Sequence, residues 1–167
     1  PQGPSTVLST FTLHDPPSAA DMGLQTMCGR LYWQAGPGAL NIKFADDKFQ
    51  EIIQRGNRLV PEAVRGVCDS IDAKPDEIDL LVTNQPNRLF LRNWRTDLGI
   101  DEDRHFDTFD RFGNLYGAGL PITLAQALED GRVQNGHLIV VAGFAHAGDF
   151  AAASAIRWRS SNSVDHA

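Results

Sequence analysis

Two short apolar runs constrain the fold of this chain more than any other feature of its sequence. Residues 80–82 are Leu-Leu-Val and residues 138–141 are Leu-Ile-Val-Val, and no polar residue interrupts either run. Runs of this kind are typical of strands at the centre of a parallel sheet, where helices cover both faces. We therefore expect an α/β layer.

The segments around these runs alternate between strand and helix patterns. Strands are expected over residues 7–14, 80–82, 105–109, 138–141 and 152–158, and helices over residues 49–71, 88–98 and 121–130. The short connection before the last strand makes it antiparallel to its predecessor. The predicted fold is thus a mostly parallel five-stranded sheet with the last strand antiparallel and helices packed on the sheet.

Local signals refine three of these segments. Asp46 and Asp47 are expected to cap the first helix. Gly56 and Pro61 lie inside its apolar pattern, which predicts a kinked helix or two short ones. Residues 19–38 are rich in glycine and are expected to form a long irregular loop.

The length of 167 residues predicts one domain. We expect a flexible N-terminus over residues 1–6, a folded domain over residues 7–159 and a flexible tail over residues 160–167. A large apolar face of the sheet is hard to bury by this chain alone, so the chain by itself is predicted to aggregate.

Composition excludes several classes of function. The net charge is −6 and the basic residues form no run, which argues against nucleic-acid binding. No apolar segment approaches the roughly 20 residues of a membrane-spanning helix, and no signal peptide is recognised. Cys28 and Cys68 are expected to be reduced thiols in a cytoplasmic protein, although they could also pair. No metal site is expected, because no cluster has metal-ligand spacing.

Amide side chains follow the predicted strands. Asn84 stands directly after the first apolar run, and Gly113 and Asn114 form a turn between the next strand and the helix that starts near Pro121. His146 follows the second apolar run. Because sites in such sheets form beyond the carboxyl ends of the strands, we expect these turns to converge. Amide groups there would donate hydrogen bonds to a carbonyl oxygen.

From residue 78 to residue 158, the chain resembles the C-terminal half of the thiolase superfamily, above all its ketoacyl-acyl-carrier-protein synthase III branch. Asn84-Gln85-Pro86-Asn87 stands where the family has a His-Gln-Ala-Asn turn. Gly113-Asn114, running on to Pro121, matches the family's Gly-Asn turn and proline-started helix. The stretches Glu129-Asp130-Gly131-Arg132, Leu138-Ile139-Val140-Val141 and Ala155-Ile156-Arg157-Trp158 are also similar.

The resemblance implies an acyltransferase or condensing enzyme that acts on acyl thioesters. In the family, a cysteine of the N-terminal half carries the acyl group, which is condensed with a malonyl thioester or passed to an alcohol or amine. A histidine and an asparagine of the C-terminal half hydrogen-bond the thioester carbonyl. Acyl-CoA or a phosphopantetheinyl acyl carrier protein is then a substrate, and no tightly bound cofactor is expected.

Three departures from the family pattern shape the predicted site. The N-terminal half is missing, so we expect a separate or cleaved chain to supply the cysteine, in a dimer of such pairs. Asn84 replaces the family histidine and cannot act as a base. A glycine-rich turn is replaced by residues 145–149, which include His146. The candidate catalytic residues are Asn114, Asn84 and His146, and the candidate substrate-binding residues are Gly113, Phe144, Ala145 and Arg88.

Several alternatives remain open from the sequence. Asn84 has an obvious local use as a helix N-cap. His146 could be a loop residue without a chemical role, and Arg88 could belong to a solvated helix face. The main functional prediction is a ketosynthase III-like enzyme of polyketide or fatty-acid-type secondary metabolism. The alternative is a non-catalytic partner subunit that completes the fold or docks a carrier protein. No Gly-x-Ser-x-Gly elbow supports an α/β hydrolase.

Overall fold

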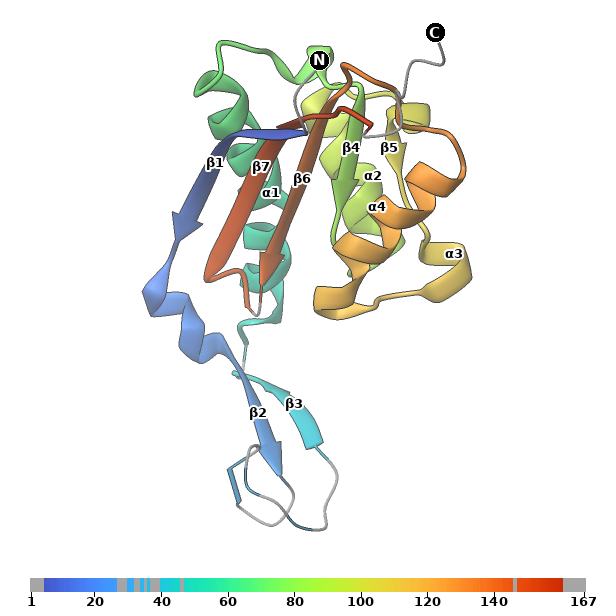
Figure 1. Cartoon of the computed structure of the whole chain (residues 1–167). Coiled ribbons are helices and arrows are strands. Elements are labelled where there is room, and N and C mark those ends of the chain that lie inside the picture. Colours follow the sequence, from blue (N-terminus) through green and yellow to red (C-terminus); the bar gives the residue numbers. More distant parts are fainter. Residues whose placement is uncertain are drawn as a thin grey trace, which may run out of the picture.

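The computed structural model describes residues 5–26, 30, 31, 34, 36, 40–45, 47–145 and 147–160. Five strands form one sheet in the order β1-β7-β6-β4-β5 (Figure 1). Their bounds are Thr6–His14 (β1), Leu80–Thr83 (β4), His105–Phe106 (β5), Leu138–Ala145 (β6) and Phe150–Arg157 (β7). β4 pairs in parallel with β5 and β6, whereas β7 runs antiparallel between β6 and β1. The predicted sheet with an antiparallel last strand is confirmed.

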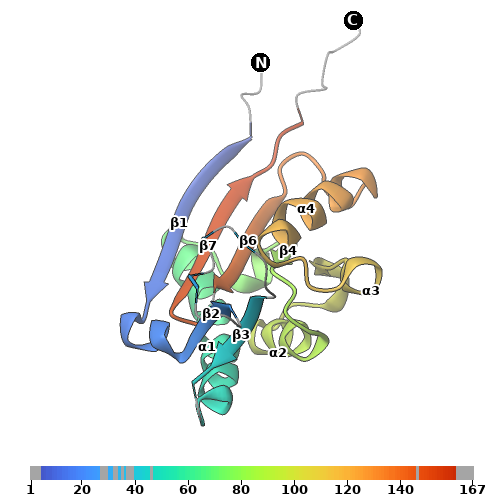
Figure 2. The same cartoon turned by 90° about the horizontal axis from the view of Figure 1, so that it is seen from below.

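Helices cover both faces of the central strands. α1 (Phe49–Asp69) and α2 (Arg88–Leu98) pack on one face, and α4 (Gly119–Glu129) packs on the other (Figure 2). Leu81 and Val140 point toward α1 and α2, while Leu80 and Ile139 point toward α4. This two-sided burial explains why the sequence of β4 contains no alternation.

α1 is one continuous helix of 21 residues, so the predicted division into two helices is wrong. Pro61 lies inside it without donating a backbone hydrogen bond. The fully buried Val60, Val64 and Val67 hold this part of the helix against the sheet, and packing therefore outweighs the local preference. The predicted cap is also wrong for Asp47, which precedes the N-cap residue Lys48; Asp46 lies outside the described residues.

α2 begins and ends as its sequence predicts. Its N-cap is Asn87, whose side chain accepts a hydrogen bond from the Phe90 amide at 3.0 Å. Gly99 ends the helix in the left-handed conformation, with a φ of 66°. Because Asn87 fills the capping position, the alternative of Asn84 as the N-cap is wrong.

The connection between β5 and α4 differs from the prediction. β5 is only two residues long, although a strand was expected over residues 105–109, and Phe109–Phe112 forms the one-turn helix α3. Asp107 Oδ1 accepts a hydrogen bond from the Phe109 amide at 2.9 Å, which turns the chain out of the sheet. α4 starts at Gly119, two residues before the predicted Pro121.

The region that was predicted to be an irregular loop contains a hairpin. β2 (Met22–Thr26) pairs antiparallel with β3 (Leu40–Phe44), and both project beyond the carboxyl ends of the main sheet (Figure 1). Met22 lies opposite Phe44, and Leu24 lies opposite Ile42. Residues that face each other share one face of a hairpin, so this face is apolar.

Short 3-10 helices make up the remaining regular structure of the described residues. They are η1 (Pro16–Asp21), η2 (Pro75–Glu77), η3 (Glu102–Arg104) and η4 (Tyr116–Ala118). β1 begins at Thr6, one residue before the predicted start, and Ser5 Oγ accepts a hydrogen bond from the Arg159 amide at 2.9 Å. Residues 1–4 and 161–167 lie outside the described residues, and the flexibility of both ends stays a prediction. Among the helices that are described, none is long and apolar enough to cross a membrane.

Candidate active site

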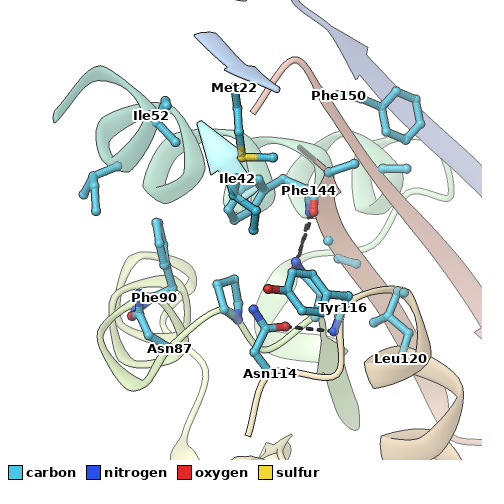
Figure 3. Close-up of a pocket in the computed structure, with 18 of the residues that line it drawn as sticks. Met22, Ile42, Ile52, Asn87, Phe90, Asn114, Tyr116, Leu120, Phe144 and Phe150 are labelled. Atoms are coloured by element: carbon cyan, nitrogen blue, oxygen red, sulfur yellow. Dashed lines mark hydrogen bonds between the residues drawn. The ribbon is translucent and has the colours of Figure 1, made fainter. Parts of the chain in front are cut away.

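A pocket of about 670 Å³ opens at the carboxyl ends of β4 and β6 (Figure 3). Asn84, Asn87 and Asn114 supply amide groups to its wall. The rest of the wall is largely apolar and comes from the hairpin β2–β3, the starts of α1, α2 and α4, and β6 and β7. Its larger apolar side chains are Met22, Ile42, Phe44, Phe49, Ile52, Ile53, Phe90, Leu120, Phe144 and Phe150. The predicted convergence of Asn84 and Asn114 at one sheet edge is thus present.

The loop after α3 fixes the orientation of the Asn114 carboxamide. Asn114 Oδ1 accepts a hydrogen bond from the Tyr116 amide at 2.9 Å, a side-chain-to-backbone turn (Figure 3). Gly113 ends α3 with a φ of 65°, a conformation that glycine adopts without strain. Asn114 is exposed, and within the described part of the chain its Nδ2 group has no hydrogen-bond partner. Nδ2 is therefore free to donate to a ligand.

Asn84 is held differently. Its Nδ2 donates to the Phe144 carbonyl at 3.0 Å, and its Oδ1 accepts from the Phe144 amide at 3.3 Å. The Asn84 amide itself donates to Ala142 O at 3.1 Å, so the side chain continues the β4–β6 ladder by one step. Gly143 makes room for this contact, because a Cβ atom there would lie 2.8 Å from Asn84 Oδ1. One N–H of Asn84 Nδ2 is thus engaged and the second remains for another acceptor.

The structure distributes the other candidates between several places. Phe144 and Ala145 line the pocket, whereas Gly113 shapes the loop beside it. Arg88 lies in a separate polar cleft, where it forms ion pairs with Asp107 at 3.2 Å and with Asp110. These carboxylates, Asp110 above all, raise the pKa of Arg88. His146 lies outside the described residues.

Arg55 joins the pocket to the body of the domain, and no sequence motif pointed to this residue. This side chain is only 12% exposed and donates to Asp21 Oδ2 at 2.6 Å and to Ala147 O at 3.1 Å. It therefore ties the start of the hairpin and the β6–β7 turn to α1. The apolar hairpin wall was missed as well, although the alternation of Leu40, Ile42 and Phe44 is a strand signal.

Cys68 is unsuited to act as a nucleophile. It lies fully buried in the core cluster between α1 and the sheet, and burial raises the pKa of its thiol to about 11. A thiol of that pKa is almost entirely protonated near neutral pH. Cys28 falls outside the described residues. The described residues contain no group of three or more His, Cys, Asp or Glu side chains that could hold a metal ion.

The sheet order, with helices on both faces and amide-bearing turns at one edge, defines the C-terminal half of a thiolase-like fold. The family described as 3-oxoacyl-[acyl-carrier-protein (ACP)] synthase III C terminal matches residues 68–158. Because this match covers more than half of the chain, the chain belongs to that family.

Individual relatives agree with this assignment. A beta-ketoacyl-[acyl-carrier-protein] synthase III from Oceanobacillus iheyensis is 31% identical over 109 residues, which are 65% of this chain and 35% of that protein. The synthase III from Synechocystis is 29% identical over 140 residues, or 78% of this chain and 42% of the relative. The chain thus spans less than half of the length of these relatives.

Solved structures show the same fold. The 3-oxoacyl-[acyl-carrier-protein] synthase III from Aquifex aeolicus superposes with a TM-score of 0.78 at 23% identity, covering 95% of this chain and 46% of that chain. OleA from Xanthomonas campestris superposes with a TM-score of 0.68 at 20% identity, covering 89% of this chain and 38% of the other.

Proposed function

We propose that this chain is the C-terminal half of a ketosynthase III-like enzyme that transfers or condenses acyl thioesters. In this scheme an N-terminal half, supplied as a separate or cleaved chain, carries the nucleophilic cysteine. The free Nδ2 group of Asn114, beside Asn84 in one pocket, is the observation that carries the proposal. The buried, protonated Cys68 supports a nucleophile that lies elsewhere.

The outer surface of α4 supports a missing half. Ile122, Ala125 and Leu128 recur every three residues and are exposed, and Glu129 is the only ionisable residue of this 11-residue helix. A helix that is apolar all round is normally covered on all sides. Val7, at 60% exposure, adds to the apolar surface on the α4 side of the sheet, since it lies opposite Ile156. A second layer of protein would bury this surface.

The chemistry of the pocket favours acyl transfer or an altered condensation. Negative charge develops on the carbonyl oxygen of a thioester when it is attacked or enolised. Asn114 Nδ2 and the second N–H of Asn84 would donate to that oxygen. Neither carboxamide takes up or releases a proton, so neither replaces the histidine that the family has at position 84. Such a site suits transfer to an alcohol or amine in polyketide or fatty-acid-type secondary metabolism.

The substrate in this proposal is an acyl-CoA or an acyl group on a phosphopantetheinyl carrier protein, with no tightly bound cofactor. The apolar wall of the pocket suits an acyl chain, and its 670 Å³ falls within the range of small-molecule sites. Dimerisation of the paired halves and a location in the cytoplasm belong to the same proposal. We infer the dimer from the resemblance to the family, and the location from the expectation that Cys28 and Cys68 are reduced thiols.

Isolation of the native complex through a tag on this chain, followed by intact mass spectrometry, tests the proposal. We expect a second chain whose cysteine gains the mass of the acyl group after incubation with an acyl-CoA. Asn114→Ala should then lower turnover by about 100- to 1000-fold, the usual effect of removing one oxyanion donor. Asn135→Ala, in the turn before β6 at the opposite end of that strand, is the control. Unchanged turnover in Asn114→Ala would overturn the assigned role.

A non-catalytic partner subunit is the second candidate. The observation that favours it is the Asn84 carboxamide, which is bonded to the Phe144 backbone at the family's histidine position. This candidate predicts that activity survives the joint replacement of Asn84, Asn114 and His146 by alanine but disappears when the chain is removed. Loss of activity in the triple variant, with the complex intact, supports the enzyme instead.

A further inference from the structure

Gln85 is a buried carboxamide beside the pocket residue Asn84, and the proposed chemistry has no use for it. It follows Asn84 directly and is 1% exposed. Its Oε1 accepts a hydrogen bond from the Thr108 amide at 2.7 Å. Its Nε2 lies 3.1 Å from Thr108 Oγ1 and 3.2 Å from Thr123 Oγ1, as donor to both. The two hydroxyl groups are 3.0 Å apart and close the network.

This network holds both flanks of the loop that carries Asn114. Thr108 is the last residue before α3, and Thr123 lies in the first turns of α4. Residues 109–118 connect Thr108 to the start of α4, and Asn114 is near the middle of that segment. A Cβ atom at Gly119 would lie 3.9 Å from Gln85 Nε2, so the start of α4 also rests against this side chain.

The connection from Gln85 to Asn114 is continuous. The Thr108 carbonyl accepts hydrogen bonds from the Arg111 amide at 3.1 Å and from the Phe112 amide at 3.0 Å. The Gly113 amide then donates to Phe109 O at 2.7 Å. A shift of Thr108 therefore moves α3 as a unit, together with the Gly113–Asn114 turn at its end.

We propose that Gln85 is a positioning residue that fixes Asn114 relative to Asn84, so that both carboxamides donate hydrogen bonds to one carbonyl oxygen. Gln85 is bonded to Asn84 through the backbone and to both flanks of the Asn114 loop through its side chain. It thus links the two amide-bearing turns, which are 30 positions apart in the sequence. The inference rests on the proposed function, because it assigns Gln85 to the same site.

Thr123→Val tests the link without touching the pocket. The substitution keeps the shape of the side chain and removes the hydroxyl that accepts from Gln85. We expect kcat of the native complex to fall by about 10- to 100-fold, the effect of a misplacement on the order of 1 Å, with KM for the acyl donor unchanged. Thr123→Ser keeps the hydroxyl and should restore kcat.

Thr83→Val is the matched control for lost stability. Thr83 is a buried threonine of β4, and its Oγ1 lies 2.9 Å from His105 Nε2, away from the loop. It should lose stability to a similar extent and keep its kcat. In the Asn114→Ala background, Thr123→Val should have little further effect on kcat, because Gln85 acts through Asn114. A full additional loss in that background, or a kcat equal to that of Thr83→Val, overturns the proposal.

Amide hydrogen exchange separates this inference from the proposed function. Thr123→Val should speed exchange at Arg111 and Phe112, whose amides bond to Thr108 O, and should leave β6 unchanged. Should Asn114→Ala retain full turnover, the proposed function fails, and exchange alone then decides whether Gln85 holds the loop. Unaltered exchange at both amides contradicts the positioning role.

Discussion

Asn84 and Phe144 exchange two hydrogen bonds, of 3.0 and 3.3 Å, across the ends of β4 and β6. The carboxamide thus takes the place of a further backbone peptide in the ladder between these strands. The Phe144 ring packs against Phe90 and Trp94, with centroid distances of 5.5 and 6.0 Å. Asn84 is therefore anchored through Phe144 to the aromatic cluster at the α1–α2 crossing. Its position depends on a residue that is 60 positions away.

Gly143→Ala should displace Asn84. The new Cβ would lie 2.8 Å from Asn84 Oδ1, closer than real Cβ contacts, and 3.1 Å from its Cγ. We expect the loss of both bonds to Phe144 and a decrease of about 1–2 kcal/mol in the free energy of unfolding, measured in urea. Gly23→Ala is the control, because nothing lies within 4 Å of its Cβ position. Equal stability of the two variants would show that Asn84 is not held as described.

Asn84→His should introduce a titrating group into the pocket. Carboxamides do not titrate, whereas an imidazole has an ordinary pKa of about 6.5. We expect the pH profile of kcat/KM for the native complex to gain an inflection near pH 6–7 that the unaltered protein lacks. An inflection that is already present without the substitution would point to another group, with His146 as the first candidate.

His105 should make the protein less stable in acid. Burial lowers the pKa of its imidazole from 6.5 to about 4, opposed by Asp107 and reinforced by Arg95. Below about pH 6.5 His105 is protonated in the unfolded chain, whereas in the folded chain it is protonated only near pH 4. Stability is therefore full above this window and falls as the pH drops through it, by up to roughly 3 kcal/mol.

His105→Gln tests this pH dependence. Glutamine keeps a polar group near Thr83 Oγ1 and cannot be protonated in this range. The difference in unfolding free energy between the two proteins should shrink or reverse as the pH falls from 6.5 to 4. Parallel curves over that window would mean that His105 titrates alike in the folded and unfolded chains.

Arg55→Met should loosen the pocket wall. The substitution removes the bonds to Ala147 O and leaves Asp21, 14% exposed, without its cation. We expect a loss of about 2 kcal/mol in unfolding free energy, since removing Arg55 leaves the largely buried carboxylate of Asp21 unpaired. Arg58→Met is the control, because Arg58 pairs with Glu62 at the surface at 2.5 Å and should lose less than about 0.5 kcal/mol. Equal losses in the two variants would show that Arg55 does not tie the start of the hairpin and the β6–β7 turn to α1.

The sequence predicted the parts of the molecule that local pattern determines. The apolar runs of β4 and β6 and the glycine that ends α2 reflect short-range preferences, and the sequence predicted these strands and this helix end correctly. The strand over residues 105–109 was predicted too long, because Asp107 Oδ1 and Gln85 Oε1 accept hydrogen bonds from the Phe109 and Thr108 amides and turn the chain out of the sheet. The Asn84–Phe144 and Arg55–Asp21 contacts join residues 60 and 34 positions apart, and no local signal reports them.

The apolar outer face of α4 should make this chain associate when it is separated from its partner. Ile122 and Leu128 are 38% and 36% exposed, and Val7 adds to the same side of the sheet. Large exposed apolar patches mark interfaces or lead to aggregation. We expect light scattering to show concentration-dependent oligomers of the isolated chain.

Ile122→Lys combined with Leu128→Lys should reduce these oligomers and also weaken capture of the second chain by the tagged protein. Asp69→Lys combined with Asp72→Lys, at the last residue of α1 and in the turn after it, is the control and should change neither property. A monodisperse isolated chain, or undiminished capture by the double variant, would show that this face is not the one that a second layer covers.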